Sequence, residues 1–276
     1  MPIARVNGVR LFWELRGETG DLVVLVHGSW GDHHNWASVV PAFERSFRVL
    51  TYDRRGHSQS ERPVGQGRIE EDVADLAALI DHLGRGPAHI VGNSFGAAIV
   101  LRLAGERPDL FRSLIVHEPP LFRLLEHEPQ AQAALSSIKE RMGVVIGMLE
   151  THDYPGGARQ FVETIAFGPG AWEQLSPELR ETFIFNASTW LDEMHDPEAL
   201  TINLDRLRRF SARALLTLGG QSAPFFPPVV RQIAGMLPQA MTSTFPEAGH
   251  VPHLSHPDEY VGVVTDFILG AALARG

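Results

Sequence analysis

The chain has 276 residues, of which 44% are hydrophobic, and a formal net charge of -9 at pH 7. This length is enough for one large α/β domain with an insertion, or for two ordinary domains. The acidic balance and the lack of a Lys/Arg-rich block argue against a nucleic-acid partner, and the absence of cysteine excludes disulfides, thiolate metal sites and a cysteine nucleophile.

The sequence contains no uninterrupted apolar segment of membrane-spanning length, and residues 1–5 lack the apolar stretch of a secretory signal. We therefore expect a cytoplasmic protein without a membrane partner. The short basic clusters Arg54-Arg55 and 206–209 are expected to be solvated or to form local ion pairs.

The first part of the chain alternates between strand and helix patterns. Residues 3–6 and 9–13 are predicted to form a hairpin, because Asn7-Gly8 suits the two positive-φ positions of a type I′ turn. Continuous apolar runs predict buried parallel strands at 22–26, 48–52, 89–91 and 113–116. Helical patterns cover 36–45, 69–83 and 97–107.

After residue 118 the pattern becomes helical, with helices predicted at 130–149, 158–167 and 176–190. Strand patterns resume at 214–218 and 241–245, and a final amphipathic helix is predicted from 257 to about 273. We thus predict an α/β protein with a mostly parallel, doubly wound sheet of about eight strands. Residues 1–118 and 205–276 would form the core domain, and 119–204 a helical lid inserted into it.

The motif Gly92-Asn93-Ser94-Phe95-Gly96 lies at a predicted strand-to-helix junction, a place that is typical of a catalytic nucleophile. The turn is so tight that side chains two residues before and two after the serine would collide. The serine itself takes a strained conformation that exposes its hydroxyl. On its own, the motif is also compatible with an ordinary glycine-rich turn.

Three more groups of chemically active residues follow predicted strands, namely 27–31, Glu118 and Gly249-His250. In an open α/β sheet, the loops at the carboxyl ends of the strands line the ligand crevice. We therefore expect these residues and Ser94 to face one site.

In this order, the motifs resemble those of the α/β-hydrolase fold superfamily, in its serine-hydrolase form with a helical cap. The resemblance is carried by 27–29 (HGS), 53–58 (DRRGHS), the Ser94 motif and 247–250 (EAGH), and so covers essentially the whole chain. It implies the α/β-hydrolase fold, with 119–204 as the cap and Ser94 at the nucleophile elbow.

The resemblance also implies that Ser94 is the nucleophile and that His250 is the base that takes its proton. The family most often places its acid, an aspartate, after the strand that follows the cap. Here Ser222 stands at about that place, and there is no Asp or Glu between Gly219 and Pro238. Some esterases, lactonases and dehalogenases of the family carry the acid where Glu118 stands, so we predict a Ser94-His250-Glu118 triad.

Other acids fit less well. Asp205 precedes the post-cap strand and should lie at the wrong edge of the sheet, and Glu247 is too close to His250 along the chain. Three further acids belong to the cap and are expected to be solvated: Asp192, Glu193 and Asp196.

The family's oxyanion hole implies backbone N–H donors at Phe95 and Ser29, with Trp30 as a further donor or a wall of the acyl pocket. Apolar side chains are candidates for the substrate pocket: Trp30, Phe122, Trp190, Phe225 and Val251. This chemistry needs no cofactor. No metal is expected, because His33-His34 and the pair His253 and His256 have no carboxylate or cysteine at a zinc-like spacing. In the family, the histidine at position 57 is usually structural.

A serine at position 94 excludes the haloalkane and epoxide opening of the family, which proceeds through an aspartyl ester. We predict that the protein hydrolyses a carboxylic ester or lactone of an apolar small molecule through an acyl-enzyme. One alternative is a hydrolase of carbon–carbon bonds in ketonic ring-cleavage products, because GNSFG resembles the elbow of those enzymes. Another is a ligand receptor or sensor that keeps the fold with little turnover.

Overall fold

The computed structural model describes residues 2–270 and contains one eight-stranded sheet. The strand order is β1-β2-β4-β3-β5-β6-β7-β8. The strands are β1 (Ile3–Val6), β2 (Val9–Arg16), β3 (Leu22–Val26), β4 (Arg48–Tyr52), β5 (Ala88–Asn93), β6 (Phe111–His117), β7 (Arg213–Gly219) and β8 (Ala240–Phe245). The pairs β1-β2 and β2-β4 are antiparallel and every other pair is parallel, which confirms the predicted fold class.

The hairpin at the N-terminus forms as predicted. Asn7 and Gly8 take φ values of 45° and 78°, as a type I′ turn requires. Tertiary pairing with β4 extends β2 beyond the predicted end, to Arg16.

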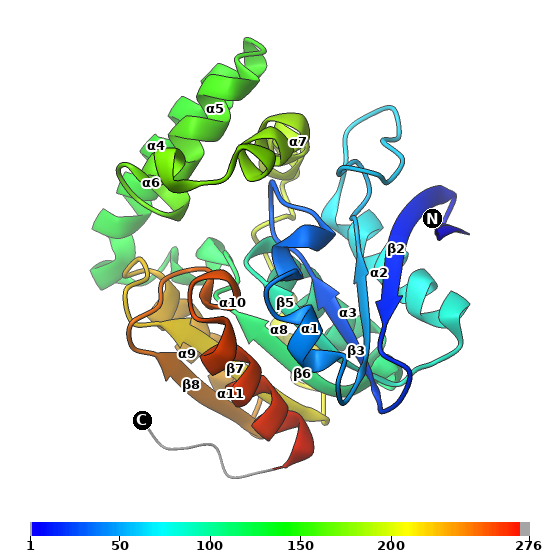
Figure 1. The fold of residues 1–276 in the computed structure, drawn as a ribbon. Coiled ribbons are helices and arrows are strands. Elements are labelled where there is room, and N and C mark those ends of the chain that lie inside the picture. Colours follow the sequence, from blue (N-terminus) through cyan, green and yellow to red (C-terminus); the bar gives the residue numbers. More distant parts are fainter. Residues whose placement is uncertain (1, 271–276) are drawn as a thin grey trace.

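Helices cover both faces of the sheet (Figure 1). Those outside the segment between β6 and β7 are α1 (Val40–Phe43), α2 (Ile69–Leu83), α3 (Phe95–Glu106), α9 (Phe226–Met236), α10 (Pro252–Ser255) and α11 (Pro257–Leu269). Successive side chains of β3 alternate between the two cores: Val24 and Val26 pack with α2 and α3, whereas Val23 and Leu25 pack with α1 and α11. Each fully buried side chain of this kind contributes roughly 1.5–3 kcal/mol of transfer free energy.

The helix predicted at 36–45 is wrong. Residues His33–Trp36 form a 3-10 turn, and only the single turn of α1 follows. Asp32 starts the turn by accepting a hydrogen bond from the backbone N–H of His34. Pro41 has no N–H to donate to the preceding turn, so one continuous helix cannot form there.

Between β6 and β7 the chain forms α4 (Gln132–Glu150), α5 (Tyr154–Phe161), α6 (Ala171–Gln174), α7 (Pro177–His195) and α8 (Leu204–Leu207). A π-helical turn, Val162–Ala166, continues α5. In Figure 1, α4–α7 lie together away from the helices that flank the sheet, and we call them the helical segment. This segment has its own apolar core, which includes Val145, Leu149, Phe183 and Trp190.

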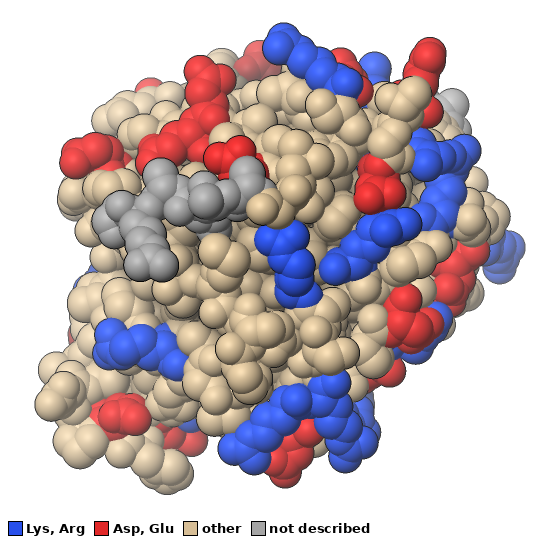
Figure 2. All heavy atoms as spheres, turned by 90° about the horizontal axis from the view of Figure 1, so that it is seen from below, with Lys and Arg blue, Asp and Glu red and all other residues tan. Residues whose placement is uncertain are grey.

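The final helix, α11, ends at Leu269, where Gly270 takes a φ of 76°. The predicted continuation through residues 271–273 lies outside the described residues. Within residues 2–270, no helix combines the length and the apolarity needed to cross a membrane. The face shown in Figure 2 carries both basic and acidic side chains among uncharged ones.

Candidate active site

Ser94 lies in a tight turn between β5 and α3, with φ 54° and ψ -123°. A Cβ atom on Gly92 would lie 2.6 Å from the carbonyl oxygen of Gly96, and one on Gly96 would lie 2.4 Å from that of Val26. Both positions therefore require glycine, as the sequence predicts. The Ser94 N–H donates to the carbonyl of His117 at 2.9 Å, which ties the turn to β6.

Glu118 directly follows β6 and is fully buried. Its Oε2 lies 2.7 Å from Nδ1 of His250, and its Oε1 accepts a hydrogen bond from the Gly219 N–H at 2.8 Å. Burial alone would raise the pKa of Glu118. The hydrogen bond from His250 and the charges nearby outweigh burial and lower this pKa below its usual value. Glu118 is therefore an ionised partner for His250 at neutral pH.

His250 lies on the loop that follows β8, and its ring stacks on Phe226 at a centroid distance of 4.8 Å. The Asn93 side chain donates to the His250 carbonyl at 3.0 Å and so joins this loop to the residue before Ser94. Ser94 and His250 line the same two cavities. Within residues 2–270, no hydrogen bond joins their side chains, and catalytic hydrogen bonds of this kind often tighten only in the complex with substrate.

The loop 27–31 passes directly against the turn of Ser94. A Cβ atom on Gly28 would lie 3.1 Å from the Cβ of Ser94. His27 Nε2 accepts from the Arg54 N–H at 3.0 Å, which leaves Nδ1 to donate to the Gly28 carbonyl at 2.8 Å. Burial and the charge of Arg54 lower the pKa of His27 to about 4, so the ring is neutral and shapes the loop.

Two cavities meet at Ser94. The first cavity is lined by Ser29, Ser94 and His250 and otherwise by mainly apolar side chains, among them Pro120, Phe122, Ile138, Met142, Phe161, Trp190, Phe225 and Phe226. We call it the apolar cavity. The second cavity adds Asn35, Asn93, Leu179, Phe183, Val251 and Leu254. Of the predicted pocket residues, Phe122, Trp190 and Phe225 line the first cavity and Val251 lines the second.

Trp30 lines neither cavity, so the expectation that it forms a pocket wall requires correction. It has a φ of 68° and is fully buried. Its ring stacks on Phe161 at 4.7 Å and lies 5.5 Å from Trp190, so it packs in the core of the helical segment. A tryptophan of this size finds more apolar contact there than beside the polar Ser94.

Two of the acids expected to be solvated are buried. Glu193 and Asp196 are each 6% exposed, although both belong to the helical segment or its end. Glu193 accepts from Arg54 at 2.9 Å and from the Ser29 hydroxyl at 2.5 Å, and Asp196 accepts from the Ile69 N–H at 2.8 Å. These core partners are distant in the chain, which is why sequence reasoning missed the contacts. Asp205 and Glu247 are exposed, which agrees with their rejection as the acid of the triad.

Arg54 is also buried, in an ion pair rather than in solvent. It donates to both carboxylate oxygens of Asp72, at 3.0 and 3.1 Å, and to Glu193. Burial would lower its pKa, but these two acids raise it above the ordinary value. His57 is likewise buried, and its Nε2 lies 3.0 Å from the hydroxyl of Thr189 on α7.

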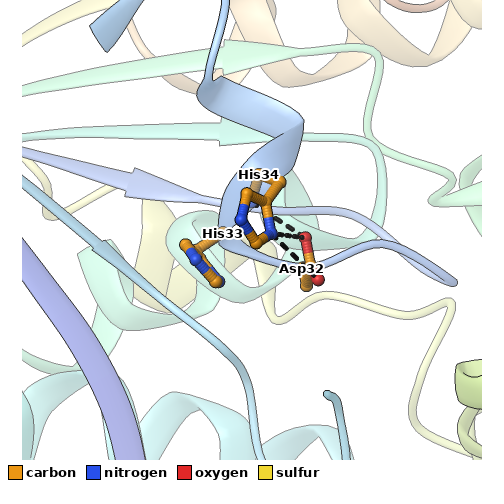
Figure 3. A group of neighbouring side chains, drawn as sticks. All are labelled: Asp32, His33 and His34. Carbon is orange, nitrogen blue, oxygen red and sulfur yellow. Dashed lines mark hydrogen bonds and ion pairs between the residues drawn. The ribbon is translucent and has the colours of Figure 1, made fainter. Parts of the chain in front are cut away.

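Two groups of side chains have atoms close enough to share a metal ion: Asp32, His33 and His34, and His117, Glu118 and His250. Figure 3 shows that Asp32 lies beside His34, although no such carboxylate was expected. The Asp32 Oδ1 and His34 Nδ1 atoms are 3.3 Å apart. Asp32 is already used as a helix cap and as an acceptor for the Ser58 hydroxyl at 3.0 Å. His33 Nδ1 pairs with Asp53 at 2.6 Å and points away from the cluster. These hydrogen bonds give Asp32 and His33 structural roles that explain why the residues of the first group lie together.

A family model described as the Alpha/beta hydrolase family matches residues 23–263. The chain belongs to the alpha/beta hydrolase family. Over 112 residues it is 41% identical to the dihydrolipoyllysine-residue acetyltransferase component of the acetoin cleaving system of Pseudomonas putida, which covers 40% of this chain and only 30% of that protein. It is 28% identical over 266 residues to the sn-1-specific diacylglycerol lipase ABHD11 of Mus musculus, covering 89% of this chain and 80% of the lipase.

Among solved structures, this alpha/beta hydrolase is similar to the enol-lactonase from Burkholderia xenovorans LB400. The TM-score is 0.77 at 22% identity, and the match covers 97% of this chain and all of the lactonase. Identity at this level shows the fold alone. The family model that matches residues 23–263 is what confirms the family membership expected from the motifs.

Proposed function

We propose that the chain is a serine hydrolase that cleaves a carboxylic ester or lactone of an apolar small molecule through an acyl-enzyme. In this proposal Ser94 is the nucleophile, His250 the general base and Glu118 the acid. The observation that carries it is the 2.7 Å hydrogen bond that Nδ1 of His250 donates to Glu118, and His250 shares its cavities with the strained Ser94.

The chemistry follows from these positions. Ser94 Oγ attacks the carbonyl carbon while Nε2 of His250 takes the hydroxyl proton, and Glu118 stabilises the imidazolium through Nδ1. The backbone N–H groups of Phe95 and Ser29 would bind the oxyanion. His250 then gives its proton to the leaving alkoxide as the carbon–oxygen bond breaks. A water molecule, activated by the same ring, hydrolyses the acyl-enzyme and restores Ser94.

The chemistry of the apolar cavity supports an apolar substrate. Among the described side chains that line it, His250 alone carries a titratable group. A substrate carboxylate would therefore be desolvated without a cationic partner. Side chains of the helical segment such as Met142, Phe161 and Trp190 form much of the lining, which supports residues 119–204 as a cap over a core of 1–118 and 205–276. A lipase and an enol-lactonase, both similar to this chain, also favour an ester bond as the target.

The test is labelling with a fluorophosphonate probe, followed by turnover of short p-nitrophenyl esters, lactones and vinylogous diketones. We expect stoichiometric labelling at Ser94, no labelling of Ser94→Ala, and turnover of an ester or lactone. Preferred cleavage of a diketone would instead favour carbon–carbon hydrolysis. Ligand binding with negligible turnover of every substrate would favour a receptor and overturn the proposal.

A further inference from the structure

One face of α7 is polar yet buried against the loops that follow β3 and β4. Asn186 and Thr189 lie on this face with Glu193, and all three are at most 7% exposed. Asn186 donates to the Gly31 carbonyl at 3.0 Å and accepts from the Ser58 N–H at 2.8 Å. Residues at these spacings share one side of a helix, so α7 docks through hydrogen bonds rather than through apolar contact alone.

Glu193 makes the contact on this face that is nearest to the proposed chemistry. Its Oε2 lies 2.5 Å from the Ser29 hydroxyl, and Ser29 lines both cavities with Ser94. Its Oε1 accepts from Nη2 of Arg54 at 2.9 Å. This hydrogen bond to a buried acid orients the Ser29 side chain.

Arg54 extends the same hydrogen-bond network to the backbone of the loop 27–31, which carries the expected oxyanion donor Ser29. Its Nη1 donates to the Gly28 carbonyl at 3.3 Å, and His27 donates to that same oxygen at 2.8 Å. The Gly28 carbonyl and the Ser29 N–H belong to one planar peptide unit, so a fixed carbonyl direction fixes the opposite direction of the N–H. The guanidinium also lies 4.7 Å from the ring centre of Phe95, the residue of the other expected donor.

We propose that Glu193 is a positioning residue: held by Arg54 and bonded to the Ser29 hydroxyl, it aims the Ser29 N–H at the oxyanion. This rests on the proposed ester or lactone hydrolysis and assigns to α7 a role in the chemical step as well as in covering the cavity. Glu193 is not among the residues that line the two cavities at Ser94, so its effect would pass through the loop 27–31.

The position of an oxyanion donor matters in the transition state more than in the bound substrate. Displacement of a catalytic group by about 1 Å costs on the order of 10²-fold in rate. Loss of Glu193 should therefore lower kcat and leave KM nearly unchanged. Glu193→Gln keeps one acceptor for Arg54 and a polar group for Ser29, so it should retain most of the activity.

The experiment measures kcat and KM, per active site titrated with a fluorophosphonate, for Glu193→Ala, Glu193→Gln, Ser29→Ala and the double variant Glu193→Ala/Ser29→Ala. Glu181→Ala is the matched control, because Glu181 is an exposed acid on the same helix. We expect kcat to fall about 10- to 100-fold in Glu193→Ala and in Ser29→Ala, and to stay unchanged in the control. The double variant should be little worse than the poorer single variant, because both changes break one contact.

Unlabelled wild-type protein would overturn the proposed function and this inference together. Labelled, active wild type with unchanged kcat in Glu193→Ala and Ser29→Ala would overturn the positioning role alone. Multiplicative losses in the double variant, or a fall in Glu193→Gln as large as in Glu193→Ala, would also overturn it. Should Glu193→Ala fail to fold, Ser29→Ala still decides, because it removes only a hydroxyl and leaves the amide in place.

Discussion

The backbone N–H of Gly219 donates a hydrogen bond to the carboxylate of Glu118 at 2.8 Å. Gly219 ends β7, at the start of the loop where related enzymes usually carry their acid, and Glu118 reaches it from β6. In the proposed triad, the loop after β7 therefore supplies a hydrogen-bond donor to the acid instead of the acid itself. This contact and the hydrogen bond to His250 occupy both oxygens of Glu118.

Replacement of Glu118 by Gln should lower kcat about 10³- to 10⁴-fold, because an amide cannot stabilise the imidazolium and can favour the wrong tautomer of His250. Steady-state kinetics on a p-nitrophenyl ester measure the loss, and circular dichroism checks that the fold is intact. Near-normal turnover in a folded Glu118→Gln protein would contradict the assignment of the acid.

An acid placed at Ser222 should restore part of this activity. The Ser222 hydroxyl lies close to Gly219, since a Cβ atom on that glycine would be 2.6 Å from it, and Gln221 bonds to the loop that carries His250. We expect Glu118→Gln/Ser222→Asp to be at least about tenfold faster than Glu118→Gln alone, as a carboxylate there could again pair with the imidazolium. Equal rates for the two variants would show that an acid at this position does not reach the ring.

Two helix glycines should respond to alanine in opposite ways. A Cβ atom on Gly96 would lie 2.4 Å from the Val26 carbonyl, so Gly96→Ala should destabilise the fold by about 1–3 kcal/mol and disturb the turn of Ser94. Gly143 on α4 has open space around it, so Gly143→Ala should stabilise the fold by roughly 0.5–1 kcal/mol. Urea denaturation measures both, and a stable, active Gly96→Ala protein would contradict the packing.

A larger side chain at Ala166 should shorten the acyl chains that the site accepts. Ala166 lines both cavities beside Ser94. We expect Ala166→Phe to raise KM for p-nitrophenyl octanoate about tenfold and to change KM for the acetate less than about twofold. The exposed Ala133 on α4 offers the control Ala133→Phe, which should behave as wild type. Equal changes for both esters would mean that acyl chains do not occupy these cavities.

The buried Glu193 should make stability fall as the pH rises. Burial raises its pKa from 4.5 to about 7 despite the charge of Arg54, and the neighbouring Asp72 adds to the rise. Between pH 4.5 and about 7, Glu193 is more often protonated in the folded state than in the unfolded chain. The free energy of unfolding therefore decreases as the pH increases. The largest slope for one such group is about 1.4 kcal/mol per pH unit.

Glu193→Gln removes this titration while keeping the contacts. We expect the free energy of unfolding of wild type, minus that of Glu193→Gln, to fall from pH 4.5 to 7 and to stay constant above. Urea denaturation of both proteins across this range provides the measurement. A difference that does not vary with pH would mean that Glu193 titrates as an ordinary glutamate.

Much of the fold could be predicted from the sequence, because buried parallel strands are continuous apolar runs. The runs at 22–26 and 48–52 match β3 and β4 residue for residue, and the helix at 69–83 matches α2. The glycines around Ser94 could be predicted too, because the constraint they satisfy is local. The pairing of Glu118 with His250 was implied by the resemblance to family members that carry their acid at this position, together with the missing acid after Gly219.

The polar face of α7 could not be predicted in the same way. Asn186, Thr189 and Glu193 have the spacing of a solvent-facing stripe, and only distant partners such as Arg54 and Ser58 turn it into an interface. A signal did exist, since Arg54 comes two residues after the end of a buried strand and needs a counter-charge if it is buried. Trp30 was misplaced for a similar reason, because its neighbours Phe161 and Trp190 come from the helical segment.

The placement of Glu118 directly after β6 has a consequence for exchange of parts between related proteins. Ser94 and Glu118 directly follow the adjacent strands β5 and β6, and α3 is the only helix between them longer than one turn. The proposed nucleophile and the proposed acid thus lie in one contiguous piece of chain that ends before the helical segment begins. A chimera could therefore receive a different helical segment after Glu118 and a different loop after Gly219. The geometry on which hydrolysis would depend should persist, provided that the new loop keeps its N–H donor to Glu118.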